Sequence, residues 1–303
     1  MADDLSAATA AQGSCQIAAL CRHLEFFAGH PAVAISPLSH GDLNVSYRVE
    51  TCRGIYVVRQ YPQHTSGVCR QQELRCQHAA AVAGIAPAPL CLNNHQQVLI
   101  SEFVTDNTPF LCDAANLTLL ADTLATFHCL STQTAVLQPH SYLKLLAQYA
   151  AAKMTSLDAA QLSLVYEVAR QFQQLSPDIV LCHLDLHAAN MVLASEKLWL
   201  LDFEYAQRAD SCLDLAGLSL YLQLDIVAEH KLLASYCQYR GNIATSQAEL
   251  NAKMRLAKIL YCSFCWLWYL SLPDRHGRHQ AQVVHWQQRL AGLLKLQATK
   301  PLS

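Results

Sequence analysis

Three polar residues stand out in an apolar, strand-like stretch late in the chain. The segment "LCHLDLHAANMVL" at 181–193 carries Asp185 and Asn190, and "LWLLDFEYA" at 198–206 carries Asp202. Carboxylate and amide oxygens are hard ligands of the kind that Mg²⁺ prefers, with phosphates and water completing its shell. These residue types therefore indicate phosphate chemistry assisted by a divalent cation.

The spacing of the three residues suggests how they are positioned. Two short strands, "NMVLA" and "LWLLD", are predicted to form a hairpin, with "EK" at 196–197 as the turn. Asn190 then begins one strand and Asp202 ends its antiparallel partner, and those two ends lie together. An Asp, an Asn five residues later and a second Asp after the next strand match the phosphoryl-transfer template of protein kinases. We expect Asn190 and Asp202 to bind Mg²⁺ and Asp185 to act on the attacking hydroxyl.

Asp185 is a weak base for an alcohol. An aspartate pKa of ~3.9 against ~15.7 for water makes full early deprotonation cost about 16 kcal/mol, at ~1.36 kcal/mol per pKa unit. Asp185 is therefore expected to orient the hydroxyl and to accept its proton late, while Mg²⁺ and cationic side chains stabilise the developing charge. The alternative is that the aspartates only cap a loop or a strand end, but the set of three at this spacing favours a site.

Composition narrows the class of protein. The chain has 303 residues, 52% hydrophobic and 15% charged, with a net charge of −2, which argues against a nucleic-acid footprint and against electrostatic membrane anchoring. The longest apolar run, 259–272, is shorter than the ~20 residues of a membrane span, so a buried helix is expected. Residues 1–14 lack the features of a secretion signal and are expected to be a loose tail. The 13 cysteines, an odd number, indicate reduced thiols in a cytoplasmic protein.

The apolar periodicity changes along the chain. Strands and one helix dominate up to residue 105, and helical spacing dominates afterwards, interrupted only at 179–206. We expect an α+β, two-lobed protein with a tail at 1–14, a small β-rich lobe at 15–105 and a larger, mainly helical lobe at 106–303. Helices are predicted over 16–29, 69–84, 118–130, 141–154, 158–175, 213–224, 228–239, 247–270 and 280–296.

The motifs resemble those of one family. "HLDLHAAN", "LLDFEYA" and "DLAGL" resemble the choline kinase and aminoglycoside phosphotransferase superfamily, small-molecule kinases with a protein-kinase-like fold. The bacterial thiamine kinase branch is most similar, in "IAPAP" at 85–89, "DLHAAN" at 185–190 and "DFEYA" at 202–206. The resemblance spans roughly residues 35–295 and implies a protein-kinase-like fold, ATP as co-substrate and Mg²⁺ as cofactor.

The resemblance also assigns residues for nucleotide binding. The segment 37–49 takes the place of the phosphate-covering hairpin, where Gly41 is the single glycine and Asn44 matches a residue frequent in the family. Arg59 stands where protein kinases carry lysine, and its planar fork can grip phosphate. Glu73 is its expected ion-pair partner. The alternative is a surface pair worth at most about 1 kcal/mol.

The segment "SEFV" at 101–104 corresponds to the hinge between the lobes. Backbone groups of Glu102 and Val104 are expected to meet the adenine edge. The alternative is that the segment is an ordinary buried strand.

Three further residues are candidates for the acceptor site. His187 is expected to orient Asp185 or touch phosphate, although a structural histidine fits equally. Glu204 is expected to reach a second metal or a cationic substrate. Trp268 lies in an aromatic stretch that suits a quaternary ammonium or thiazolium, although such a stripe is more often core.

Asp214, at a predicted helix start, is expected to accept hydrogen bonds from backbone amides of the catalytic loop and so to have a structural role.

These observations predict an ATP-dependent kinase that phosphorylates a hydroxyl of a small, cationic alcohol. Thiamine is the first choice, choline or ethanolamine the second and an aminoglycoside the third. A nucleotide-binding pseudokinase that regulates a partner is the alternative from another class. The expected partners are ATP and the alcohol, with no nucleic acid or membrane, and the chain is expected to be a monomer or homodimer.

Overall fold

The computed structural model describes residues 13, 15–40, 44–62, 68–241, 247–273 and 277–299. The chain divides into two compact units. The first is Met1–Pro109 with Val192–Glu204, and the second is Phe110–Met191 with Tyr205–Ser303. The expected α+β architecture, a small antiparallel sheet unit and a mostly helical one, is confirmed. The first unit therefore includes a segment from late in the chain, Val192–Glu204.

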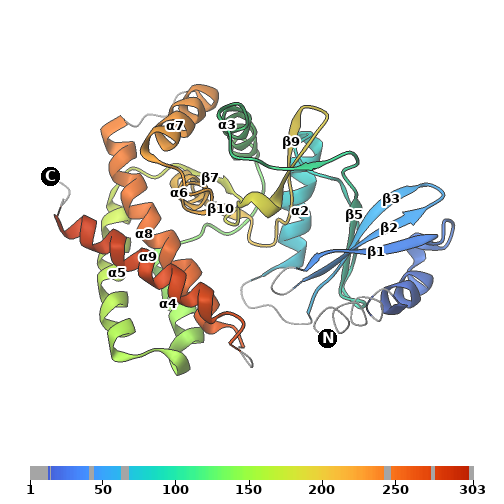
Figure 1. The fold of residues 1–303 in the computed structure, drawn as a ribbon, viewed down its shortest axis with the longest axis horizontal. Helices are drawn as coiled ribbons and strands as arrows, with labels where there is room; N and C mark the ends of the chain where they lie inside the picture. Colours follow the sequence, from blue (N-terminus) through green and yellow to red (C-terminus); the bar gives the residue numbers. More distant parts are fainter. Residues whose placement is uncertain are drawn as a thin grey trace. The chain divides into compact units, whose positions relative to one another are not determined.

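The first unit is built on a five-stranded antiparallel sheet in the order β1-β2-β3-β5-β4 (Figure 1). Its core forms where alternate, largely β-branched side chains of the strands, such as Val49 and Val58, meet a helix at 15–23 and the 3-10 turn Glu25–Phe27. Strand β4 was not expected from the sequence. The strands are β1 (Ala34–His40), β2 (Val45–Thr51), β3 (Gly54–Gln60), β4 (Pro89–Asn93) and β5 (Val98–Glu102).

Helix α2 (Arg70–Val82) crosses from β3 to β4 and ends where the sequence predicted. Gly84 adopts φ +73°, and the amides of Gly84 and Ile85 bond to the carbonyls of Ala81 and Ala80. These are the two bonds of a Schellman cap, which needs a left-handed residue that glycine adopts without strain. The prolines that follow prevent the helix from continuing.

A small sheet, in the order β6-β8-β9, contains the predicted hairpin. Its strands are β6 (Thr108–Pro109), β8 (Met191–Ala194) and β9 (Lys197–Leu200). The turn consists of Ser195 and Glu196, at φ +51° and +59°, so the prediction of a turn at 196–197 was wrong by one residue. Two successive left-handed residues match a type I′ turn, whose twist suits a two-residue hairpin.

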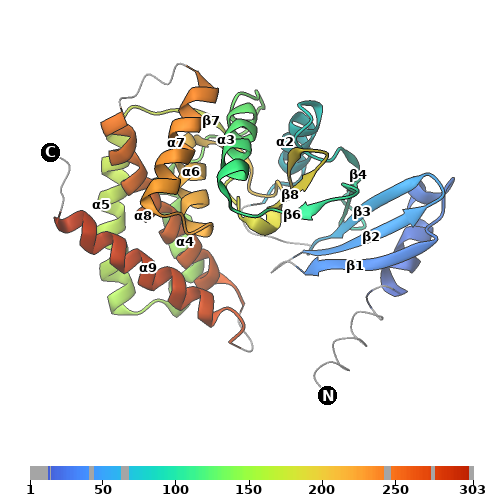
Figure 2. The same ribbon diagram turned by 45° about the horizontal axis from the view of Figure 1, so that its top comes forward.

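The second unit is mainly helical (Figure 2). Local signals start its helices: Asp113 caps α3, Pro139 is the first residue of α4, and Thr155 with Asp158 forms a capping box on α5. A two-stranded sheet, β7 (Ile179–Cys182) with β10 (Gln207–Asp210), carries the loop after β7. The helices are α3 (Ala114–His128), α4 (Pro139–Ala150), α5 (Ser156–Gln174), α6 (Ser211–Tyr221), α7 (Ile226–Arg240), α8 (Gln247–Ser271) and α9 (Gln280–Thr299).

Helix α8 is the centre of this unit and packs against α4, α5, α6 and α9. The apolar run 259–272 falls mostly within it, and Trp266 and Leu267 are fully buried. The prediction of a buried helix is therefore confirmed. Among the described residues, no helix has the length and hydropathy to cross a bilayer.

Candidate functional site

The predicted Arg59–Glu73 pair forms inside the first unit. Arg59 extends from β3, and its Nη1 lies 2.9 Å from Oε1 of Glu73 on α2 and 2.6 Å from Oδ1 of Asp202 after β9. The Glu73 side chain is only 1% exposed. The alternative of a weak surface pair is therefore wrong, because a charge this deeply buried must be paired.

The surroundings of Arg59 keep its guanidinium group protonated. Burial alone would lower the pKa of Arg59, but the nearby carboxylates of Asp202, Glu73 and Glu204 outweigh it and raise the pKa above its ordinary value. A permanently charged guanidinium with a planar fork suits a phosphate ligand.

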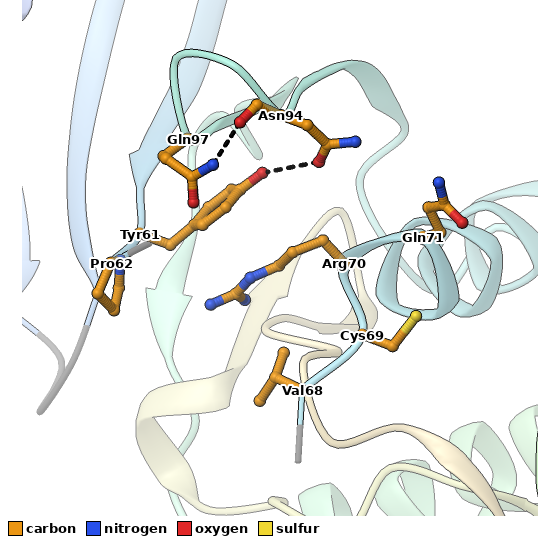
Figure 3. Close-up of a pocket in the computed structure, with 8 residues that line it drawn as sticks. All are labelled: Tyr61, Pro62, Val68, Cys69, Arg70, Gln71, Asn94 and Gln97. Carbon is orange, nitrogen blue, oxygen red and sulfur yellow. Dashed lines mark hydrogen bonds between the residues drawn. The ribbon is translucent and has the colours of Figure 1, made fainter. Parts of the chain in front are cut away.

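Arg70 completes this cluster and was missed by the sequence reading. It is the first residue of α2 and donates through Nη1 to Glu73 Oε2 at 2.8 Å and to Glu204 Oε2 at 3.2 Å. Its guanidinium carbon lies 4.2 Å from the centre of the Tyr61 ring, alongside which it lies in Figure 3. Both residues line an open pocket of about 330 Å³. The i to i+3 spacing from Arg70 to Glu73 was the available signal.

Asn44 and Glu204 meet in the same cluster. Asn44 Nδ2 donates to Glu204 Oε2 at 2.9 Å, and both side chains are buried. Burial and the nearby Asp202 charge raise the pKa of Glu204, while Arg59, Asn44 and Arg70 act in the opposite direction. Residues 41–43 of the predicted phosphate-covering segment 37–49, including Gly41, lie outside the described residues.

The backbone at Asp202 is unusual. Its φ is +62°, a left-handed conformation that aspartate tolerates better than most residues. Such conformations cost of order 1–3 kcal/mol and gather at functional sites. Asp202 lies two residues after β9, and its carboxylate therefore leaves the chain in a direction that an extended residue would not give.

The predicted hinge residues lie at the end of β5, which Glu102 ends and Val104 follows. The Glu102 amide bonds to the Ala88 carbonyl at 2.9 Å, and the Val104 carbonyl accepts from Asn107 Nδ2 at 2.6 Å. An adenine contact would therefore use the other backbone groups of these two residues, the Glu102 carbonyl and the Val104 amide. Strand β5 is buried from Val98 to Ser101 and exposed at Glu102, so both the adenine contact and the alternative of an ordinary buried strand stay open.

The second unit contains the loop, with Asp185 and Asn190, for which the sequence predicted a catalytic role. Asp185 follows β7, and Asn190 ends the short 3-10 turn Ala188–Asn190. Asn190 Nδ2 donates to the Asp185 carbonyl at 2.8 Å and to its Oδ2 at 3.0 Å. Because Nδ2 serves Asp185, Oδ1 of Asn190 is the atom that could ligate a hard cation.

Helix α6 stabilises the loop that carries Asp185 through hydrogen bonds to Asp214. Asp214 accepts hydrogen bonds from the amides of His183 and Leu184, each at 2.7 Å, and its Oδ2 also lies 3.1 Å from His128 Nε2. The prediction that Asp214 accepts catalytic-loop amides is confirmed. His128 in turn contacts the Tyr236 hydroxyl through Nδ1 at 2.6 Å, so both ring nitrogens are used within the protein.

The Asp185 carboxylate lies close to His187, whose ring contacts Tyr221. His187 Nε2 lies 3.7 Å from Asp185 Oδ2, and the His187 ring centre lies 5.2 Å from that of Tyr221. Burial is the main cause that raises the pKa values of Tyr142, Tyr221 and Tyr261, with a smaller contribution from the Asp185 charge. These hydroxyls therefore stay protonated across the usual pH range.

Trp268, the predicted aromatic residue of the acceptor site, contacts other aromatic side chains of the second unit. It packs edge-to-face on Tyr205, with ring centres 6.4 Å apart, and on Tyr269, at 4.8 Å. The ring is half-buried, so it is neither a fully enclosed core residue nor a demonstrated wall of the acceptor site. Its contact with a cationic substrate stays a prediction.

The cysteines do not form a metal site or a disulfide framework. All 13 lie among the described residues, where no disulfide forms. The chain has one C-x-x-C pair in helix α8, Cys262 and Cys265, of which Cys262 is buried. Cys182 approaches His128 and Asp214, but the histidine and carboxylate already hold the loop and Tyr236, as described above.

The residues predicted for magnesium come from both units. Asn190 belongs to the second and Asp202 to the first, so their shared binding of one ion stays a prediction. The donor set fits such an ion, because both side chains offer oxygen and Asn190 already directs its nitrogen to Asp185.

A small sheet unit with a buried Arg–Glu pair and a helical unit with an Asp-x4-Asn loop define a protein-kinase-like protein. Residues 34–256 match the model of the phosphotransferase enzyme family, APH, and the chain belongs to this family.

Similar proteins are known in sequence and in structure. Protein LicA of Haemophilus influenzae is 29% identical over 112 residues, which cover 36% of this chain and about a third, 33%, of that relative's length. A choline/ethanolamine kinase family protein from Mesorhizobium loti has a TM-score of 0.74 at 17% identity, covering 94% of this chain and 95% of its own. Choline kinase LicA from Streptococcus pneumoniae has a TM-score of 0.69 at 18% identity, covering 86% and 94%.

Proposed function

We propose that the protein transfers the γ-phosphoryl group of ATP to the hydroxyl of a small, cationic alcohol. The observation that carries the proposal is the catalytic loop, in which Asn190 bonds to both the backbone and the carboxylate of Asp185. Membership of the phosphotransferase enzyme family supports the same activity.

The first unit would bind the nucleotide. Arg59 and Asn44 are proposed to contact phosphate, with Glu73 holding Arg59 in place. The Glu102 carbonyl and the Val104 amide are proposed to meet adenine. A LicA structure in complex with AMP, similar to this chain with a TM-score of 0.69 at 18% identity, supports a nucleotide ligand.

Asn190 and Asp202 are proposed to hold Mg²⁺ through oxygen atoms. When bound, the ion would neutralise phosphate charge. Asp185 would orient the acceptor hydroxyl and take its proton late, as bond formation to phosphorus acidifies it. His187, 3.7 Å from Asp185, would help to orient that carboxylate, and Glu204 would balance the charge of Arg70.

Choline or ethanolamine is our first candidate for the acceptor. The relatives named above include choline and choline/ethanolamine kinases, which reverses the order suggested by the sequence, where thiamine came first. The Tyr221 ring, whose centre lies 5.2 Å from that of His187 beside Asp185, would favour a quaternary ammonium through cation–π attraction. A thiazolium has the same preference, so thiamine stays a prediction to be tested beside them.

The test is ATP turnover by the full chain with choline, ethanolamine, thiamine and an aminoglycoside in separate assays. Turnover with one cationic alcohol supports the proposal and identifies the acceptor. Nucleotide binding without transfer to any of the four would contradict it and favour the pseudokinase. Mass measurement of the purified protein would test the predicted monomer or homodimer.

A further inference from the structure

The residue before Asp185 has an unusual backbone. Leu184 adopts φ +65°, a conformation that is rare for a bulky side chain and persists only when neighbouring groups enforce it. This turn sets the direction in which the chain enters Asp185. The groups that hold the Leu184 peptides therefore also orient the carboxylate.

Two side chains hold Leu184, one through its amide and the other through its carbonyl. Asp214 Oδ1 accepts from the Leu184 amide at 2.7 Å, and the Tyr261 hydroxyl donates to the Leu184 carbonyl at 2.9 Å. Tyr261 is 3% exposed, and burial raises the pKa of its hydroxyl well above the ordinary value. The hydroxyl therefore remains a donor across the usual pH range.

Helix α6 supplies the space that Tyr261 needs. Gly217 lies one turn after Asp214 on this helix, and a Cβ added at Gly217 would lie 2.7 Å from Tyr261 Cζ and 3.1 Å from its hydroxyl oxygen. The absence of a side chain at this position therefore allows the ring to reach Leu184. Helix α6 therefore contributes to both hydrogen bonds of Leu184: Asp214 accepts one directly, and Gly217 leaves room for Tyr261 to donate the other.

We propose that Tyr261, seated on Gly217, is a positioning residue that orients Asp185 through the Leu184 carbonyl. The proposal rests on the catalytic role proposed for Asp185. It assigns Tyr261 no contact with the substrate: its hydroxyl acts on the loop backbone, and the effect on the reaction comes through the direction of the Asp185 side chain.

The first test is Tyr261→Phe in the full chain, which removes one oxygen and keeps the ring. Loss of one neutral hydrogen bond should lower kcat roughly fivefold while KM for ATP stays within about twofold. Hydrogen exchange of the amides at 183–185, followed by mass spectrometry, should become faster in the variant. An unchanged kcat or an unchanged exchange rate would overturn the proposal.

Two matched controls separate positioning from general destabilisation. Val165→Ala removes buried volume on α5, where Val165 is fully buried, and should lower the free energy of unfolding. At temperatures where this variant is folded, its kcat should equal that of the wild type. Gly217→Ala should reproduce the Tyr261→Phe effects, whereas Gly292→Ala in α9, where an added Cβ meets nothing within 4 Å, should not. Should Gly217→Ala fail to fold, Tyr261→Phe alone decides.

The exchange measurement also separates this proposal from the proposed function. It needs no turnover, so faster exchange in Tyr261→Phe would establish the hold on Leu184 even if the wild type transferred phosphate to no acceptor. That second result would overturn the kinase proposal, and with it the catalytic meaning of the Tyr261 contact.

Discussion

Arg59 and Asp202 are 143 residues apart in the chain, yet Nη1 of the arginine donates to Oδ1 of the aspartate at 2.6 Å. The contact joins β3 to the end of the β9 hairpin within the first unit. Together with Glu73, it places a permanent cation between two carboxylates. The residue proposed for phosphate is thereby paired directly with a residue proposed for magnesium.

Replacing Arg59 tests its proposed contact with phosphate. Arg59→Gln should weaken ATP binding about tenfold or more, since a charge-assisted bond to phosphate is lost. Arg59→Lys should weaken it less, because a charge remains but the planar fork does not. Calorimetric titration with ATP and Mg²⁺ measures both. Wild-type affinity in Arg59→Gln would show that this arginine serves only the local ion cluster.

Asp185→Asn tests the catalytic loop. The amide keeps the size of the side chain but cannot accept the proton, so kcat should fall about a hundredfold or more, with ATP affinity nearly unchanged. Asp225→Asn is a suitable control, because Asp225 caps α7 and asparagine caps helices equally well. A near-normal rate in Asp185→Asn would assign the proton to another group.

Arg70 and Arg170 allow a comparison of how much a buried and an exposed arginine–glutamate pair contribute to the free energy of unfolding. Each pairs with a glutamate three residues away in a helix, but the Arg70 side chain is 11% exposed and that of Arg170 is 58% exposed. Arg70→Gln should cost about 1–3 kcal/mol of unfolding free energy, because buried Glu73 and Glu204 lose a partner. Arg170→Gln should cost less than about 1 kcal/mol. Urea denaturation compares them, and equal losses would refute the distinction.

The buried thiol of Cys21 should make the protein less stable at alkaline pH. Burial raises its pKa from 9.0 to about 11, so the folded state resists losing this proton. The stabilising contribution is complete below pH 9 and is lost as pH rises toward 11. Cys21→Ala should therefore show a shallower decline of unfolding free energy between pH 8 and 11 than the wild type. Cys52, which is exposed, provides the control: Cys52→Ala should leave the slope unchanged.

Local signals explain which parts of the fold were predictable. The predicted helix 247–270 matches α8 (Gln247–Ser271), and the predicted stop at Gly84 matches the Schellman cap of α2. Strands β4, β6 and β10 were missed. β6 has only two residues, too few for a periodic pattern. β10 has the sequence QRAD, which lacks the β-branched and aromatic residues typical of strands. Their pairing depends on partners far along the chain.

The sequence by itself determined the chemical groups: Asp185, Asn190 and Asp202 at kinase-like spacing, and the Arg59–Glu73 pair. Only the tertiary structure revealed that Arg70 joins that pair to Glu204 and that Tyr261 reaches Leu184 across the space at Gly217. Residue types and short spacings are properties of the chain, whereas these contacts join segments separated by up to 134 residues. They arise because packing brings buried polar groups together, and such groups are stable only when they find partners.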